Sequence, residues 1–166
     1  NLLSYKKYNF NGISNIICVS DSIKEIMSKT VEDSQKLKVI YDGIDLSKFN
    51  HPESSTLKRE LGLEGKRLIA NISSLSEEKD HYTFVDTAEK VTKQYPDTHF
   101  LIIGSGKEYN QINDYILSKG LNSDITMLGF RNDVPALFSI LDVSLITSTM
   151  EGLGSTILDA FASKVP

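Results

Sequence analysis

Short runs of apolar and β-branched residues alternate along the chain with longer segments in which apolar residues recur every three or four positions. This alternation is typical of βα units, in which helices connect the strands of a mostly parallel sheet. Residues 100–103 are all apolar, as expected for a strand that is covered on both faces. The strands are predicted at residues 15–19, 37–41, 67–73, 99–104, 125–128 and 142–147.

Amphipathic helices are predicted between these strands, and their ends carry the expected stop and start residues. Pro96 and Gly120 each follow a helical stripe and end it, whereas Pro135 lies just inside the start of a short helix. The pattern therefore predicts an α/β fold, with a parallel sheet that has helices on both faces. The helices are predicted at residues 80–95, 108–119, 133–141 and 154–163, with a weaker one at 56–61.

The segment 41–65 differs in composition from its flanks, because it is polar and contains Pro52 and two consecutive serines. We interpret it as a linker between residues 1–40, the remnant of a preceding domain, and residues 66–166, an α/β domain. The chain has no initiator methionine, no signal peptide and no apolar run of membrane-spanning length. Its last residues resemble a helix end that leads into a strand, so we expect a piece that is incomplete at both ends.

Composition and charge exclude several functional classes. Of the 166 residues, 40% are hydrophobic and 24% are charged, and the net charge is −4, so we expect a globular protein without a basic surface for nucleic acid. The single cysteine, Cys18, lies in an apolar run and is interpreted as a packed hydrophobic residue. The three histidines lack metal-ligand spacing and there is no Asp-x-Asp pair, so we expect no metal site.

A glycine-rich turn, Gly104-Ser105-Gly106-Lys107, lies between a predicted strand and a predicted helix, which is the setting of a phosphate-binding loop. Tyr109 stands where the dinucleotide-binding pattern requires a third glycine, and the Walker pattern also fails. We therefore interpret the turn as structural, with the lysine as a candidate for a phosphate contact.

The segment 150–159 follows the last predicted strand, at the sheet edge where open parallel sheets bind ligands. Its two glycines allow a ligand close to the backbone, and free peptide N–H groups of 152–155 at a helix start attract an anion. Glu151 and Asp159 can accept hydrogen bonds from sugar hydroxyls. From the residues alone, a surface acid, a turn and a capped helix explain the segment equally well.

Five short segments of the chain together carry a family resemblance, at residues 19–22, 39–45 with Phe49, 74–81, 129–134 and 151–160. In this order they resemble the retaining nucleotide-sugar glycosyltransferases of the GT-B fold, the group 1 or family 4 class. Each segment is weak alone, but their joint order and spacing span nearly the whole chain. The resemblance implies two Rossmann-like domains that face each other across a cleft. This chain would be the C-terminal, donor-binding domain with a remnant of the first.

The resemblance assigns roles to the charged residues. Glu151 resembles the first acid of the family's Glu-x7-Glu motif, which positions the donor sugar ring. Asp159 occupies the second position of the motif, which holds the ribose hydroxyls. Lys79 matches the lysine that neutralises the diphosphate as the leaving group gains charge.

The resemblance also implies contacts to the rest of the donor. A solvated surface residue explains Arg131 equally well when that residue is considered alone. The segment that lines the base matches Gly129, Phe130 and Arg131, and N–H groups for the sugar and phosphate come from Gly152, Leu153, Gly154 and Ser155.

Two departures from the family's pattern affect this site. Many members have Gly-Arg-Leu where this chain has Ser73-Ser74-Leu75, so the arginine that shares the phosphate is missing. Lys79 would then work with the hydroxyl of Ser74, with Lys107, or with a residue from another segment. Aspartate in place of glutamate at the ribose position shortens the side chain by about 1.5 Å, so the ribose contact needs a water or a closer backbone.

The resemblance therefore implies a metal-independent glycosyltransferase that moves a sugar from a UDP- or GDP-sugar with retention and needs no cofactor. The acceptor, a glycan or a lipid-linked glycan, would bind mainly to the N-terminal domain, so the isolated chain is expected to be inactive. The implied location is cytoplasmic, with peripheral association at the cytoplasmic face of the membrane. Two alternatives remain at this point, a sugar-nucleotide epimerase of related fold and a non-catalytic nucleotide-binding module.

Overall fold

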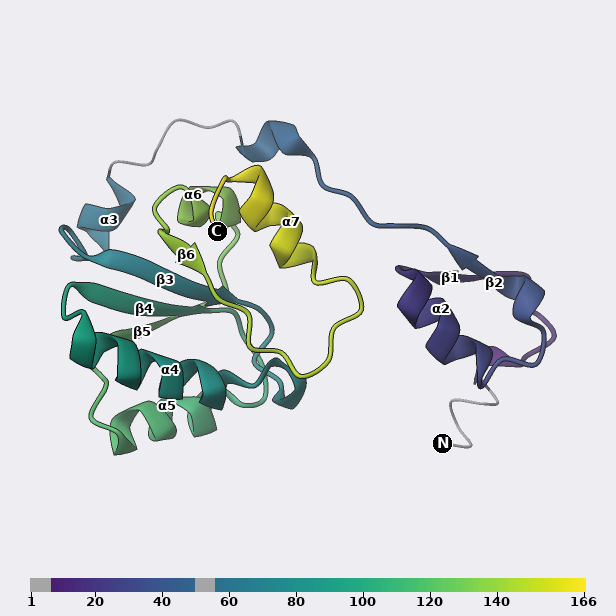
Figure 1. Ribbon diagram of the computed structural model, residues 1–166, viewed down its shortest axis with the longest axis horizontal. Helices are drawn as coiled ribbons and strands as arrows, with labels where there is room; N and C mark the ends of the chain where they lie inside the picture. Colours follow the sequence, from purple (N-terminus) through teal and green to yellow (C-terminus); the bar gives the residue numbers. More distant parts are fainter. Residues whose placement is uncertain (1–6, 50–55) are drawn as a thin grey trace. The chain divides into compact units, whose positions relative to one another are not determined.

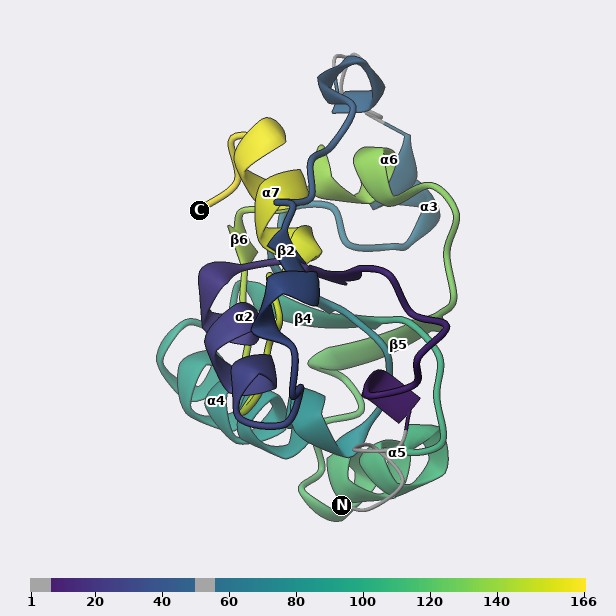
Figure 2. The ribbon, with the colours of Figure 1, turned by 90° about the vertical axis from the view of Figure 1, so that its right-hand side faces the viewer.

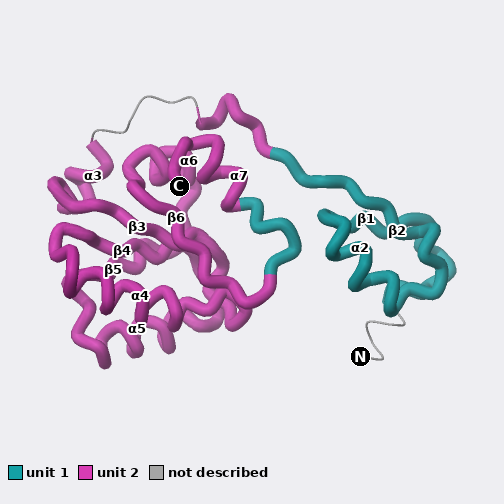
Figure 3. The backbone as a smooth tube through the Cα atoms, viewed as in Figure 1, with its two compact units in different colours: residues 1–43, 151–155 teal, residues 44–150, 156–166 magenta. Residues whose placement is uncertain are grey.

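The computed structural model describes residues 7–49 and 56–166, which form two compact units (Figure 3). The first unit comprises residues Asn1–Gly43 together with Glu151–Ser155, and the second comprises Ile44–Met150 together with Thr156–Pro166. The short segment that carries Glu151 is thus grouped with the N-terminal residues, although its neighbours along the chain belong to the second unit.

The first unit contains two parallel strands connected by a helix. Cys18 is 1% exposed in its small core, as expected for a packed hydrophobic residue. No residue range was predicted for this helix, although Ser20 caps it by accepting a hydrogen bond of 3.2 Å from the N–H of Ile23. A capping serine followed by an acid is the signal that could have revealed it. The elements are β1 (Ile16–Cys18), α2 (Asp21–Ser28), η1 (Ser34–Lys36) and β2 (Leu37–Val39).

The second unit contains a four-stranded parallel sheet with the strand order β5-β4-β3-β6. The two central strands pair along their whole length, from Arg67 opposite Thr98 to Ile72 opposite Ile103. The edge strand at 142–147 is shorter than predicted, because the chain leaves the sheet after Ser144. The strands are β3 (Arg67–Ile72), β4 (Thr98–Ile103), β5 (Ile125–Gly129) and β6 (Val143–Ser144).

Helices cover both faces of this sheet, with α4 and α5 on one face and α6 and α7 on the other (Figures 1 and 2). Each predicted helix is present, with ends that differ from the prediction by one to three residues. The helices are α3 (Leu57–Glu60), α4 (His81–Gln94), α5 (Tyr109–Ser118), α6 (Val134–Phe138) and α7 (Ser155–Ala162), with single 3-10 turns at η2 (Leu46–Phe49) and η3 (Glu77–Lys79).

The buried strand β4 supplies both halves of the core, because its successive side chains point to opposite faces. Leu101 and Ile103 pack with α6 and α7, whereas Phe100 and Ile102 pack with α4 and α5. The segment predicted as a linker also contributes, since Leu57 and Leu63 are 5% and 7% exposed in the first of these clusters. Residues 50–55 of the predicted linker, and residues 1–6 of the predicted remnant, lie outside the described residues.

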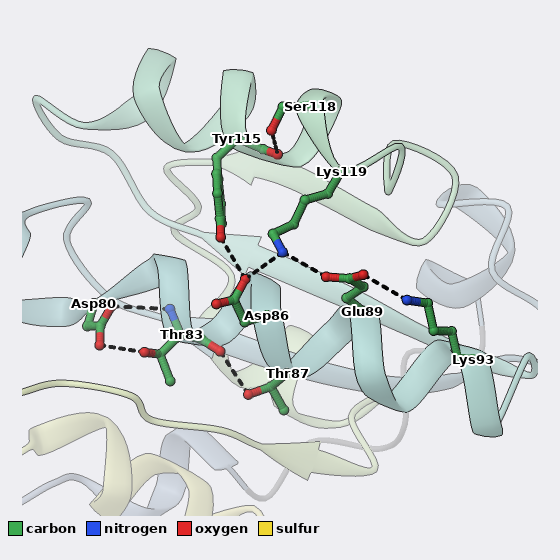
Figure 4. Close-up of polar contacts among 9 residues, drawn as sticks. All are labelled: Asp80, Thr83, Asp86, Thr87, Glu89, Lys93, Tyr115, Ser118 and Lys119. Atoms are coloured by element: carbon green, nitrogen blue, oxygen red, sulfur yellow. Dashed lines mark hydrogen bonds and ion pairs between the residues drawn. The ribbon is translucent and has the colours of Figure 1, made fainter.

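A network of charged residues connects α4 to α5 (Figure 4). The ammonium of Lys119 contacts Asp86 at 2.9 Å and Glu89 at 2.7 Å, and the hydroxyl of Tyr115 donates to Asp86 at 2.8 Å. Lys93 contacts the other oxygen of Glu89 at 2.7 Å. Hydrogen bonds from the two lysines lower the pKa of Glu89 to about 2. The network attaches α5 to α4, the helix that begins directly after the loop of Lys79.

Candidate functional site

The carboxyl ends of β3, β4 and β5 lie at one edge of the sheet, and a loop follows each of them. The peptide N–H of Leu75 donates to the carbonyl of Ser105 at 3.0 Å, and the N–H of Glu108 donates to the carbonyl of Leu75 at 3.2 Å. A Cβ on Gly106 would lie 2.2 Å from that same carbonyl oxygen. The backbone of the glycine-rich turn therefore packs directly on the loop after β3, which gives its glycine at 106 a structural reason. The contact of Lys107 with a phosphate stays a prediction.

A pocket of about 260 Å³ opens at this edge of the sheet. It contains three of the residues predicted to bind the donor, Ser74, Phe130 and Arg131. Gly129 directly precedes the last two, and its carbonyl accepts a 2.8 Å hydrogen bond from the N–H of Gly104. The residues of the pocket come from all three loops, as expected for a parallel sheet. They are Ile72, Ser73, Ser74, Ile103, Gly104, Ser105, Phe130, Arg131 and Val134.

Arg131 is fixed at the pocket by a carboxylate two residues away. Its Nε donates to Oδ1 of Asp133 at 2.7 Å, and its Nη2 donates to Oδ2 at 2.5 Å. These hydrogen bonds lower the pKa of Asp133 and raise that of Arg131. A bidentate pair holds the planar guanidinium in one orientation, while 30% of the arginine side chain stays exposed. Phe130 beside it is 69% exposed, so its ring is open to a ligand.

Lys79 is the last residue of η3, and its carbonyl is held by a residue from a distant part of the chain. The hydroxyl of Thr147 donates to the carbonyl oxygen of Lys79 at 3.0 Å. The next residue, Asp80, adopts the left-handed conformation with φ 44° and caps α4 by accepting a hydrogen bond from the N–H of Thr83 at 3.1 Å (Figure 4). The chain therefore turns sharply at Lys79, between η3 and α4.

A buried polar network lies beneath this loop. The hydroxyl of Ser73 donates to Oδ1 of Asn71 at 2.6 Å and lies 3.3 Å from Nε2 of His81. His81 is fully buried, and burial lowers its pKa, so the ring is held neutral. The sequence analysis missed this network. A serine and an asparagine at the carboxyl end of a buried strand are the signal that could have indicated it.

The segment that begins with Glu151 is described with the first unit. The hydroxyl of Ser20 donates to the carbonyl of Gly152 at 3.2 Å. A Cβ on Gly152 would lie 3.4 Å from a methyl group of Val19, which is an ordinary van der Waals contact. Glu151 itself is exposed. The last residue of the segment, Ser155, is the first residue of α7, one position after the predicted start of this helix at 154.

Asp159 lies on α7 and is partly buried. Burial raises the pKa of its carboxyl group, and the charge of Lys48 opposes this shift. Thr156, on the preceding turn of the same helix, donates to the carbonyl of Ile72 at 3.2 Å. This hydrogen bond ties the start of α7 to the end of β3, the strand that leads into the pocket.

The structure thus brings Ser74, Phe130 and Arg131 together at one pocket, with Gly129 at its margin. Lys79 belongs to the same loop as Ser74 but is not among the residues that line the pocket. Glu151, Gly152, Leu153, Gly154 and Ser155 belong to the other unit. No group of three His, Cys, Asp or Glu side chains within residues 7–49 and 56–166 could hold a metal ion. No helix in the described part of the chain is long and apolar enough to cross a membrane.

Comparisons with known proteins agree with this architecture. A family model described as "Glycosyl transferases group 1" matches residues 53–166. Over 158 residues the chain is 30% identical to the UDP-Gal:alpha-D-GlcNAc-diphosphoundecaprenol alpha-1,3-galactosyltransferase of Escherichia coli, an alignment that covers 91% of this chain and 41% of that protein. The chain spans less than half the length of the curated relatives it matches.

Solved structures show the same fold. The crystal structure of HepE from Anabaena in complex with UDP and glucose matches with a TM-score of 0.84 and 25% identity, over 92% of this chain and 43% of that one. WaaG, a glycosyltransferase involved in lipopolysaccharide biosynthesis, matches with a TM-score of 0.84 at 16% identity, over 97% of this chain and 45% of its own. The predicted fold, a Rossmann-like part of a GT-B protein, is confirmed.

Proposed function

Since the chain belongs to the group 1 glycosyl transferases, we propose that it is the donor-binding half of an enzyme that transfers a sugar from a nucleoside diphosphate sugar to an acceptor. The observation that carries this proposal is the pocket of about 260 Å³ at the carboxyl ends of β3, β4 and β5. Such an edge is where open α/β sheets bind nucleotides. The crystal structure of HepE, of the same fold, is a complex with UDP and glucose.

We assign the base to this pocket, and the ribose to a residue of α7 that is not among those that line it. The exposed ring of Phe130 offers a face on which a planar base can stack, and the fixed guanidinium of Arg131 closes one side. Ser74, in the loop after β3, lines the same pocket and its hydroxyl group is a candidate polar partner for the donor. Asp159, whose carboxylate accepts hydrogen bonds from vicinal hydroxyls, is assigned to the ribose.

The diphosphate and the sugar are assigned to residues outside the pocket. Lys79 supplies the positive charge that stabilises the leaving diphosphate as its charge develops. The N–H groups of Gly152, Leu153, Gly154 and Ser155, at the start of α7, supply further donors. Glu151 positions the sugar ring. These groups need no metal ion to bind a diphosphate, so we propose a metal-independent reaction.

The proposed reaction retains the configuration of the anomeric carbon. The bond between that carbon and the phosphate oxygen breaks, and the acceptor hydroxyl oxygen bonds to the same face. The acceptor proton passes to the departing phosphate, which acts as the base. No side chain of this chain is required as a nucleophile.

The acceptor is proposed to be a glycan or a lipid-linked glycan. It would be bound mainly by the N-terminal domain, at the cytoplasmic face of the membrane. Two of the proteins named above, the galactosyltransferase of Escherichia coli and WaaG, are transferases, so the comparisons favour this function over a sugar-nucleotide epimerase. Incubating the whole protein with donor alone distinguishes the two, because only an epimerase forms an epimerised nucleotide sugar without an acceptor. The isolated chain is expected to bind nucleotide weakly and to transfer nothing.

Titration calorimetry of the chain with UDP, GDP and uridine tests the proposal. We expect UDP or GDP to bind, and Lys79→Ala to weaken that binding about tenfold through the loss of one charge-assisted contact. Uridine binding should be unchanged in this variant. Lys90→Ala removes an exposed lysine from the outer part of α4 and is the matched control. Equal diphosphate binding by wild type and Lys79→Ala would show that the phosphate assignment is wrong.

A further inference from the structure

Two threonines that follow β6 contact the backbone of the loop that carries Lys79. The hydroxyl of Thr147 donates to the carbonyl oxygen of Lys79 at 3.0 Å. Thr149 contacts the preceding carbonyl, that of Glu78, through its peptide N–H at 2.9 Å and through its hydroxyl at 3.3 Å. The two contacts connect segments that are about 70 residues apart in the sequence. They join the loop after β3 to the segment that leads to Glu151.

The two threonines differ in what their side chains contribute. The contact of Thr149 is made mainly by its backbone, so it persists when the hydroxyl is removed. The contact of Thr147 is made by its hydroxyl, and the residue is partly buried. Replacing Thr147 by a residue without a hydroxyl therefore removes this hydrogen bond to the carbonyl of Lys79. The same replacement at Thr149 keeps the backbone hydrogen bond to the carbonyl of Glu78.

The peptide that follows Lys79 is where the chain changes direction. Asp80 has φ 44° and ψ 59°, a conformation that residues with a Cβ rarely adopt. On the helix side its carboxylate is bonded to both the N–H and the hydroxyl of Thr83, at 3.1 and 2.7 Å. On the other side Thr147 holds the carbonyl of Lys79. The turn at Lys79 is thus anchored from two directions.

From this geometry we infer that Thr147 is a positioning residue, which fixes the backbone of Lys79 so that its ammonium group is aimed at the diphosphate of the donor. The inference rests on the proposed function, because it assigns the diphosphate to Lys79. A lysine on a flexible four-carbon chain binds an anion best when its Cα is fixed. The same contact also joins the loop of Lys79 to the segment before Glu151.

Comparison of UDP with uridine distinguishes positioning of Lys79 from a general structural role. Both ligands use the base and ribose contacts, but only UDP carries the diphosphate. We expect Thr147→Val to weaken UDP binding about fivefold to tenfold, the equivalent of one lost hydrogen bond, and to leave uridine binding unchanged. Thr147→Ser keeps the hydroxyl and should restore UDP binding. Thr149→Val is the matched control and should bind UDP as the wild type does.

Each outcome is decisive when the ligands are titrated against the wild-type chain and the three variants in parallel. Selective loss of UDP binding in Thr147→Val, with recovery in Thr147→Ser, supports the inference. Equal loss of UDP and uridine binding overturns it and indicates a structural role, as would a similar UDP loss in Thr149→Val. If Thr147→Val binds UDP as tightly as the wild type does, the inference is overturned but the proposed function is not. If the wild-type chain binds neither UDP nor GDP, the proposed function fails and the inference fails with it.

Discussion

A Cβ atom on Gly104 would lie 1.8 Å from the carbonyl oxygen of Ser73, because the loop after β4 lies directly against the loop after β3. Gly104 also has φ +147°, where side chains are strained. We expect Gly104→Ala to lower the free energy of unfolding by about 1–3 kcal/mol through overpacking and strain. Urea unfolding followed by circular dichroism measures this loss. Nucleotide binding should weaken as well, since both residues line the pocket.

The variant Gly120→Ala distinguishes the effect of the steric clash at position 104 from the effect of backbone strain. Gly120 has φ +68°, but a Cβ there would meet nothing within 4 Å. This variant should lose about 1 kcal/mol, the cost of a left-handed residue with a side chain, and should keep its nucleotide binding. If the two variants unfolded at the same urea concentration, the close approach of the two loops would not explain the glycine at 104.

The pair formed by Arg131 and Asp133 predicts a different binding pattern from that of Lys79. Asp133→Asn removes one charge and one of the two parallel hydrogen bonds, so the guanidinium is no longer fixed at the pocket. We expect UDP and uridine to bind about threefold to tenfold more weakly, and by the same factor, because the base end of the ligand is affected. Calorimetry with both ligands measures the two factors.

Asp114→Asn is the control for this substitution, because Asp114 is an exposed aspartate on α5. It should leave both affinities unchanged. Loss of UDP binding alone in Asp133→Asn would place Arg131 at the phosphates instead of the base.

The network between α4 and α5 predicts a stability change at low pH. Lys119 and Lys93 lower the pKa of Glu89 from 4.5 to about 2. A carboxyl group with a lowered pKa in the folded state stabilises the fold above its unfolded pKa, and this contribution is lost as the pH falls from 4.5 toward 2. We expect Glu89→Gln to lower the Tm by a few degrees at pH 7, and the difference from wild type to shrink below pH 4. A constant difference would contradict the assignment.

The order of strands and helices could be predicted because it depends on local patterns. The consecutive apolar residues of 100–103 indicate a strand buried on both faces, and β4 is that strand. The prediction of a strand at 142–147 was too long, because the apolar residues after Ser144 continue the pattern while the chain turns away. Thr147 there bonds to the carbonyl of Lys79 instead of continuing the ladder of β6.

The candidate site could be predicted only where it follows from the topology. Ser74 and Arg131 each follow a parallel strand, so they meet at one sheet edge, and the pocket contains both. The pairs that fix the loops are contacts between distant segments, such as Thr147 with Lys79, and nothing in the local sequence indicates them. The serine at the position of the family's arginine could be identified from the sequence, but the contacts of Thr147 and Thr149 with the loop of Lys79 could not.

The buried ring of His81 predicts a loss of stability in mildly acidic solution. Burial lowers the pKa of His81, an effect that the nearby charge of Lys79 reinforces and that of Asp80 opposes. The unfolded chain therefore binds a proton at a pH where the folded chain does not. The resulting contribution to stability is complete above the unfolded value near 6.5 and is lost as the pH falls below it.

Urea unfolding at pH 7.5 and pH 5.0 checks this sign with His81→Gln as the variant. Glutamine can still hydrogen bond to Ser73 but does not titrate, so its free energy of unfolding should fall less between the two pH values than that of the wild type. The pKa of His99 is also lowered by burial, but His99 is present in both proteins, so the difference between them isolates His81. Parallel losses in the two proteins would mean that His81 is protonated equally in the folded and unfolded states.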